Sequence, residues 1–185
     1  TLLYSGRDTM ECVRDYAMYA AVFGLFSFSW FGWAQEKPRP GWRNYLGMAA
    51  GAALLVCLVG VYLSVTNWHA PSALSDRTAF QRYLLLVSVE FALALAGALV
   101  LLKKRRKDEI APWIALIVGL HFFGLKNVFA DAGLSVLAVL LIVVALVSRP
   151  IARKLQVASS AITGIGVGTA LFAFAILGLI RFMSV

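Results

Sequence analysis

The chain has 185 residues, of which 61% are hydrophobic and only 14% are charged. A soluble globular domain is about half apolar and about a quarter charged. A water-soluble core of this size cannot bury so much apolar surface, which excludes a soluble domain and indicates a lipid bilayer as the surroundings. The net charge of +8 resides in short turns between apolar runs. This pattern is typical of membrane topology and argues against a nucleic-acid partner.

Six apolar segments are long enough to cross about 30 Å of hydrocarbon as helices, and none shows the alternation of a membrane β-barrel. We expect spans over residues 14–34, 44–66, 78–102, 110–129, 132–147 and 157–180. The predicted fold is an all-α, polytopic six-helix bundle in one transmembrane domain over residues 1–185. Three of its turns are basic.

The connections between these spans carry recognisable breaking and capping signals. Pro38 and Pro40 exclude a continuous helix after the first span. The longest polar connection is 67–77, in which Ser75 or Asp76 is expected to cap the third helix. The run Ser148-Arg149-Pro150 is expected to break the fifth helix.

Small residues predict where helices approach closely. Gly47 and Gly51 in the second span, and Gly164 and Gly168 in the sixth, form small-xxx-small pairs. These faces can pack within the chain, against a second copy, or against another membrane protein. The fifth span is almost uniformly apolar and is expected to face lipid. The sixth, rich in Gly, Ser and Thr, is expected to be an interior or oligomer-contact helix.

The distribution of basic residues predicts the orientation. The turns after the first, third and fifth spans hold eleven of the seventeen Lys and Arg residues. Cytoplasmic loops collect Lys and Arg, so these turns are expected in the cytoplasm and both termini outside. We expect a multi-pass protein of a bacterial-type cytoplasmic membrane, with the lipid bilayer as its main partner.

Two ionisable residues fall near the middle of apolar spans. Glu90 is twelve residues from Thr78 and thirteen from Lys103, roughly 18–20 Å from either end of its helix. His121 lies eleven residues after Ile110, roughly 17 Å from the same face. A short turn joins these helices, so the residues lie at nearly equal depth on antiparallel neighbours.

Charged groups at this depth are costly, and most of them face the bundle interior or a cavity. Glu90 and His121 are therefore candidates for a proton-exchanging or ion-binding site. The alternative interpretation is a structural hydrogen bond that holds two helices together. Lys126 and Asp131 follow near the outer end of the fourth span. Lys126 either extends outward to the interface or forms, with Asp131, a second polar station on an exit path.

The sequence contains no GxxxxGK[ST], HExxH or CxxC motif. We therefore expect no catalytic residues, metal ligands or cofactor. Three classes of function remain open. The first is a small transporter or channel-like protein with a Glu90/His121 site. The second is a non-catalytic scaffold, accessory subunit or assembly factor. The third is an intramembrane enzyme acting on a lipid or quinone. Enzymatic activity is less favoured than the two non-enzymatic hypotheses.

Overall fold

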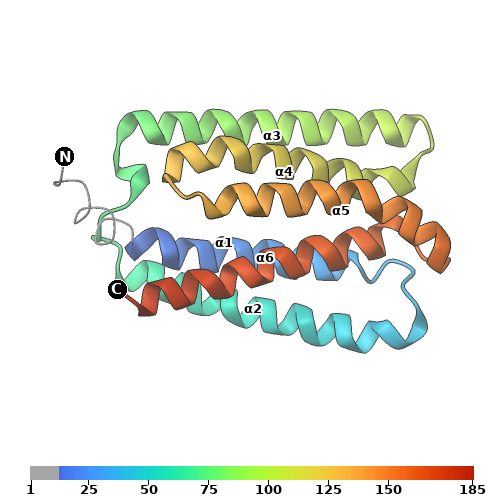
Figure 1. Ribbon diagram of the computed structural model, residues 1–185, viewed down its shortest axis with the longest axis horizontal. Coiled ribbons are helices and arrows are strands. Elements are labelled where there is room, and N and C mark those ends of the chain that lie inside the picture. The colour runs from blue at the N-terminus through green and yellow to red at the C-terminus, as the bar shows by residue number, and fades with distance from the viewer. Residues whose placement is uncertain (1–12) are drawn as a thin grey trace.

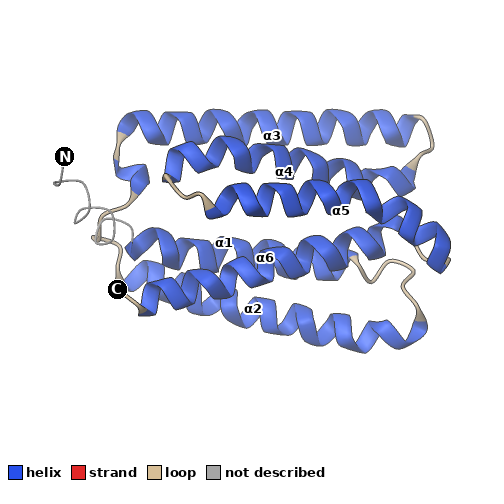
Figure 2. Cartoon of the chain, in the orientation of Figure 1, coloured by secondary structure: helices blue, strands red, loops and turns tan. Residues whose placement is uncertain are grey.

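The computed structural model describes residues 13–185, and this part of the chain folds into long helices joined by short loops (Figures 1 and 2). The helices are α1 (Val13–Trp33), α2 (Arg43–Thr66), α3 (Arg77–Lys103), α4 (Ile110–Phe129), α5 (Gly133–Leu155) and α6 (Ser159–Met183). Three single turns of 3-10 helix, Pro40–Trp42, Ala73–Ser75 and Lys107–Glu109, precede α2, α3 and α4. The all-α prediction is confirmed over the described range.

Five segments of the described chain are long and apolar enough to cross a membrane. They are Pro40–Thr66, Arg77–Lys103, Lys107–Phe129, Gly133–Leu155 and Ser159–Met183. The protein is therefore a helical membrane protein. The remaining helix, α1, is rich in aromatic residues and packs closely against both α2 and α6. A sixth span through α1 stays a prediction.

The helices do not follow one another in space in chain order. Close neighbours are α3 with α4, α4 with α5, α5 with α6, α6 with α1, and α1 with α2. Figure 1 shows α3 at one edge of the bundle and α2 at the opposite edge. Helix α3 packs mainly against α4 and has no fully buried residue. Because α3 lies at the edge of the bundle and packs mainly against α4, a shielded polar side chain on α3 finds its partner on α4.

Glycines allow α1 and α2 to cross at very short range. A Cβ added at Gly24 would lie 2.7 Å from the backbone nitrogen of Cys57, and one at Gly60 would lie 2.7 Å from the carbonyl carbon of Ala20. These obstacles are backbone atoms, which cannot change rotamer to make room. Backbone contact of this kind is the usual basis of tight helix packing in membranes.

The two small-residue pairs predicted from the sequence have different surroundings. A Cβ at Gly164 would meet the carbonyl oxygen of Trp30 at 2.6 Å, and one at Gly168 would meet the ring of Phe31 at 2.8 Å. These glycines therefore pack α6 against α1, and α6 is an interior helix as expected. Gly47 and Gly51 have nothing within 4 Å of an added Cβ, so they serve no contact inside the described chain.

Two expectations about the fifth helix are wrong. Helix α5 continues through Pro150 to Leu155, and Figure 1 shows it bending near this end. A proline removes one backbone hydrogen bond and kinks a helix, but packing on both sides can hold the helical path. The helix also does not simply face lipid, because Leu137 and Leu141 are completely buried between α4 and α6. An evenly apolar sequence does not indicate which side of the helix is covered by other helices.

Carboxylates fix the loops at both ends of the bundle. Asp76 accepts a hydrogen bond from the Ala79 amide at 2.8 Å, so it is the cap of α3. Asp15 is 3% exposed and accepts bonds from the Ser72 hydroxyl and the Ala73 amide, which holds the α2–α3 connection against α1. At the opposite end, Glu36 accepts from the Ser160 hydroxyl at 2.8 Å, beside the N-terminus of α6.

Candidate functional site

Glu90 stands at the centre of α3, thirteen residues from Arg77 and thirteen from Lys103. Its side chain makes an ion pair, through Oε2, with Nδ1 of His121 on α4. The structure thus brings together the two midspan residues that the sequence placed at equal depth. This contact joins the central parts of α3 and α4, and Trp113 Nε1 on α4 also donates to the Leu93 carbonyl oxygen on α3 at 3.2 Å.

The pair is largely shielded from the surroundings. The His121 side chain is 7% exposed and the Glu90 side chain 18% exposed. The Glu90 carboxylate lies beside Nδ1, and this buried nitrogen makes no hydrogen bond within the described residues. When Nδ1 carries the proton of a neutral imidazole, the other nitrogen, Nε2, holds the lone pair and can accept a hydrogen bond.

Both side chains lie in the wall of a cavity of about 180 Å³. Its walls come mainly from α1, α3 and α4, with Leu134 of α5 and Leu171 of α6 among the remaining lining residues. Helices α1 and α3 are not close neighbours. Aromatic side chains span the wider gap between α1 and α4, where the Tyr19 and Phe129 ring centroids are 5.6 Å apart. The cavity occupies the space that these helices leave unfilled.

The cavity walls are strongly aromatic. Lining side chains of this kind come from α1, α3 and α4: Tyr19, Phe23, Phe26, Trp30, Tyr83, Phe91, Phe122 and Phe129. Most of the other lining residues are aliphatic, so Glu90 and His121 form the charged part of the wall. A site of this type suits a largely apolar molecule with one polar group.

The exposure of the rim indicates where the cavity opens. Val22 and Phe26 on α1 are 42% and 46% exposed, and Phe91 on α3 is 62% exposed. All three also line the cavity. The opening therefore lies between α1 and α3, on the side of the bundle rather than at its ends. In a membrane this side faces the hydrocarbon.

The other two predicted site residues lie outside the cavity lining. Lys126 is exposed near the end of α4. Asp131 makes an ion pair of 2.8 Å with Arg181 of α6 and accepts a hydrogen bond from the Gly133 amide. These contacts tie the start of α5 to the end of α6, which is a structural role. The structure thus unites Glu90 with His121 and leaves the other two apart.

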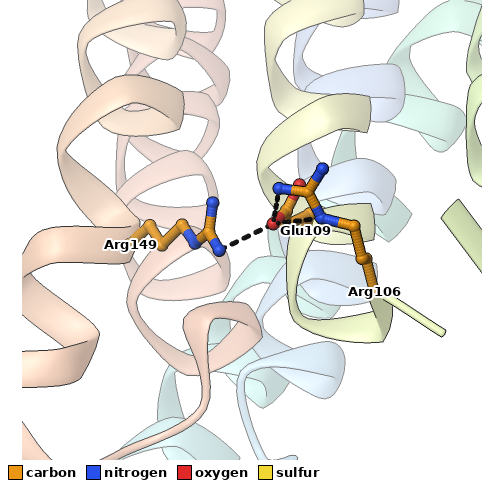
Figure 3. Close-up of polar contacts among 3 residues, drawn as sticks. All are labelled: Arg106, Glu109 and Arg149. Atoms are coloured by element: carbon orange, nitrogen blue, oxygen red, sulfur yellow. Dashed lines mark hydrogen bonds and ion pairs between the residues drawn. The ribbon is translucent and has the colours of Figure 1, made fainter. Parts of the chain in front are cut away.

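The charged turn between α3 and α4 has its own contacts. Glu109 Oε1 forms ion pairs with Arg106 Nη2 at 2.6 Å and with Arg149 Nη2 at 2.7 Å. Figure 3 shows the two arginines reaching this carboxylate from opposite sides, one from the turn and one from α5. The turn is therefore anchored to α5, and its other basic side chains remain exposed.

Sequence reasoning missed the contribution of α1 to the cavity. Phe23, Phe26 and Trp30 of α1 line the cavity. The available signal was the density of aromatic residues in α1. That signal does not say which distant helix the rings face.

Comparisons with protein-family models, with curated proteins and with solved structures found no match for this chain.

Proposed function

We propose that this protein is a small membrane transporter whose site is the cavity between α1, α3 and α4, with the Glu90–His121 pair as its polar group. The observation that carries the proposal is that the two ionisable residues contact each other in a cavity wall. Ionisable side chains at this depth are expensive and mark substrate or proton paths more often than packing sites.

The chemistry of the pair supports a role in moving a proton or holding a cation. A carboxylate beside an imidazole offers both a negative charge and a hydrogen-bonding nitrogen to a cation or a polar ligand. A purely structural bond between α3 and α4 has no need of a neighbouring cavity. No serine, threonine or cysteine occurs among the cavity-lining residues of the described chain, so catalysis by a hydroxyl or thiol nucleophile of these types receives no support from this site.

The proposal is tested by cysteine accessibility in sealed vesicles. In a Cys12→Ser/Cys57→Ala background, single Val87→Cys and Val118→Cys variants place a thiol in the cavity wall. A membrane-impermeant methanethiosulfonate reagent is added to one side of the vesicles and then to the other. Transport requires that water reach the cavity, so we expect both thiols to react from at least one side.

Two controls set the scale for this experiment. Val136 on α5 is 57% exposed and does not line the cavity, so Val136→Cys reports a thiol facing lipid. Lys104→Cys reports an exposed thiol in the charged turn. If both cavity thiols react as slowly as Val136→Cys from each side, the transporter proposal is wrong.

The same vesicles test the proposed orientation. We propose that the turns carrying the eleven basic residues lie in the cytoplasm of a bacterial-type membrane, with both termini outside. Lys104→Cys should then react only from the cytoplasmic side. Reaction only from the other side would reverse the orientation.

A second function, a scaffold or accessory subunit, is favoured by a separate observation on α2. Gly47 and Gly51 meet no other part of the described chain, and Tyr45 and Met48 beside them are 74% and 73% exposed. An exposed small-residue pair suits close approach of a helix from another chain. Replacing both glycines by leucine should then reduce a dimer or complex measured by cross-linking in native membranes. An unchanged assembly removes the support for this function.

A further inference from the structure

We infer that the ligand of the cavity is a single aromatic ring bearing a hydroxyl group, with the hydroxyl donated to Nε2 of His121. The inference deepens the proposed function, because it rests on the cavity being the functional site. It names the chemical class that the cavity recognises. Size, wall chemistry and the His121 acceptor each contribute to it.

The volume limits the ligand to about one ring. The cavity measures about 180 Å³. An apolar cavity of about 150 Å³ in another protein admits benzene. One six-membered ring with a small substituent therefore fits within the cavity.

The walls favour an aromatic ligand over an aliphatic one of equal size. Rings from α1 and α4 in the cavity wall contact each other, as in the 5.7 Å edge-to-face pair of Phe23 with Phe122. Offset and edge-to-face pairs contribute about 0.5–1.5 kcal/mol beyond the burial of area. A flat ring placed among these side chains makes such contacts on several sides.

His121 supplies the hydrogen-bond acceptor. His121 lines the cavity, and its Nδ1, which lies beside the Glu90 carboxylate, is buried and makes no hydrogen bond within residues 13–185. A ligand hydroxyl donated to Nε2 would add one hydrogen bond, which contributes about 0.5–1.5 kcal/mol. A phenolic hydroxyl is a good donor to the lone pair of a neutral imidazole.

The lateral opening bears on where such a ring comes from. Val22 and Phe91 line the cavity and are 42% and 62% exposed, so a substituent on the ring can pass between α1 and α3. The ring is then either a free phenol that dissolves in the membrane or the head of a hydroquinone with an alkyl tail. Both sources share the same recognition chemistry, a hydroxylated ring.

The test compares 4-fluorophenol with fluorobenzene by fluorine NMR on the purified protein in deuterated micelles. The two probes differ by the hydroxyl alone. One hydrogen bond contributes about 0.5–1.5 kcal/mol, so we expect 4-fluorophenol to bind roughly 2- to 10-fold more tightly. In His121→Phe this preference should disappear, so that the two probes bind with equal affinity.

Cavity-filling variants separate binding in the cavity from partition into the micelle. Val118→Phe on α4 and Val87→Phe on α3 fill the cavity from different helices, so one folding failure leaves the other variant for the test. Both should abolish the bound signal. Val136→Phe, on the exposed face of α5, should retain it. Equal binding of the two probes to the wild-type protein, or binding that survives in both filled variants, overturns the inference.

A competition arm distinguishes the sources of the ring. 2-Decylhydroquinone should displace 4-fluorophenol at lower concentration than 2-methylhydroquinone if the natural ligand carries a tail. Equal displacement indicates a free phenol. Ring binding without thiol access from water would keep this inference and refute transport. Thiol access from water without ring binding would keep the transport proposal and refute this inference.

Discussion

The tight crossing of α1 and α2 at Gly60 gives the sharpest test of the packing. We predict that Gly60→Ala destabilises the protein, whereas Gly51→Ala on the same helix does not. A Cβ at Gly60 would lie 2.7 Å from the Ala20 carbonyl carbon and 2.8 Å from the Ala21 Cα. Carbon atoms in contact normally lie about 3.5–4.0 Å apart. The helices must therefore separate by about 1 Å.

The magnitude follows from two opposing effects. Overpacking of this kind costs about 1–3 kcal/mol. Replacing glycine by alanine inside a helix returns about 1 kcal/mol through backbone propensity. Gly51 meets nothing within 4 Å, so its variant gains the propensity without the clash. We expect the free energies of unfolding of the two variants to differ by about 1–3 kcal/mol.

Cys57 provides the assay, because it is a buried free thiol at this same crossing. In a Cys12→Ser background, a maleimide dye reports how fast Cys57 becomes reactive as sodium dodecyl sulfate is added. Gly60→Ala should shift the midpoint to lower detergent fraction, and Gly51→Ala should leave it equal or raise it. Identical midpoints for the two variants would refute the close crossing.

Three further variants test other contacts. Gly97→Leu should move α3 away from α4, because a Cβ at this position collides with the Trp113 indole. Cross-linking between cysteines placed on the two helices should become weaker. Unchanged cross-linking would contradict this prediction. Asp15→Ala should leave the Ser72 hydroxyl and the Ala73 amide without their buried acceptor. The expected loss of stability is about 1–3 kcal/mol. Limited proteolysis should then cleave the 67–76 connection faster than in the wild-type protein. Glu109→Gln should change the free energy of unfolding by less than about 1 kcal/mol. The Arg106 and Arg149 side chains are 52% and 40% exposed, and exposed ion pairs contribute little to stability. A larger loss in the detergent titration would contradict this prediction.

Much of the site was accessible to sequence reasoning. The equal depth of Glu90 and His121 follows from residue counts along two helices joined by a short turn, because the rise per residue in a helix is constant. Their contact did not follow, since depth leaves the rotation of each helix undetermined. Lys126 and Asp131 illustrate this limit, because they lie close to the pair in sequence and outside the cavity in space.

Composition and local pattern alone determined the helical membrane class, the helix count and the approximate turns, because hydropathy and helix-breaking residues act within a short stretch of chain. The tertiary structure decided which faces meet. It showed that Gly60 packs where Gly47 and Gly51 do not, that α5 runs through Pro150, and that α1 encloses a cavity with α3 and α4. These outcomes depend on backbone separations between helices distant in sequence, and in lipid they are set by shape complementarity more than by apolar pattern.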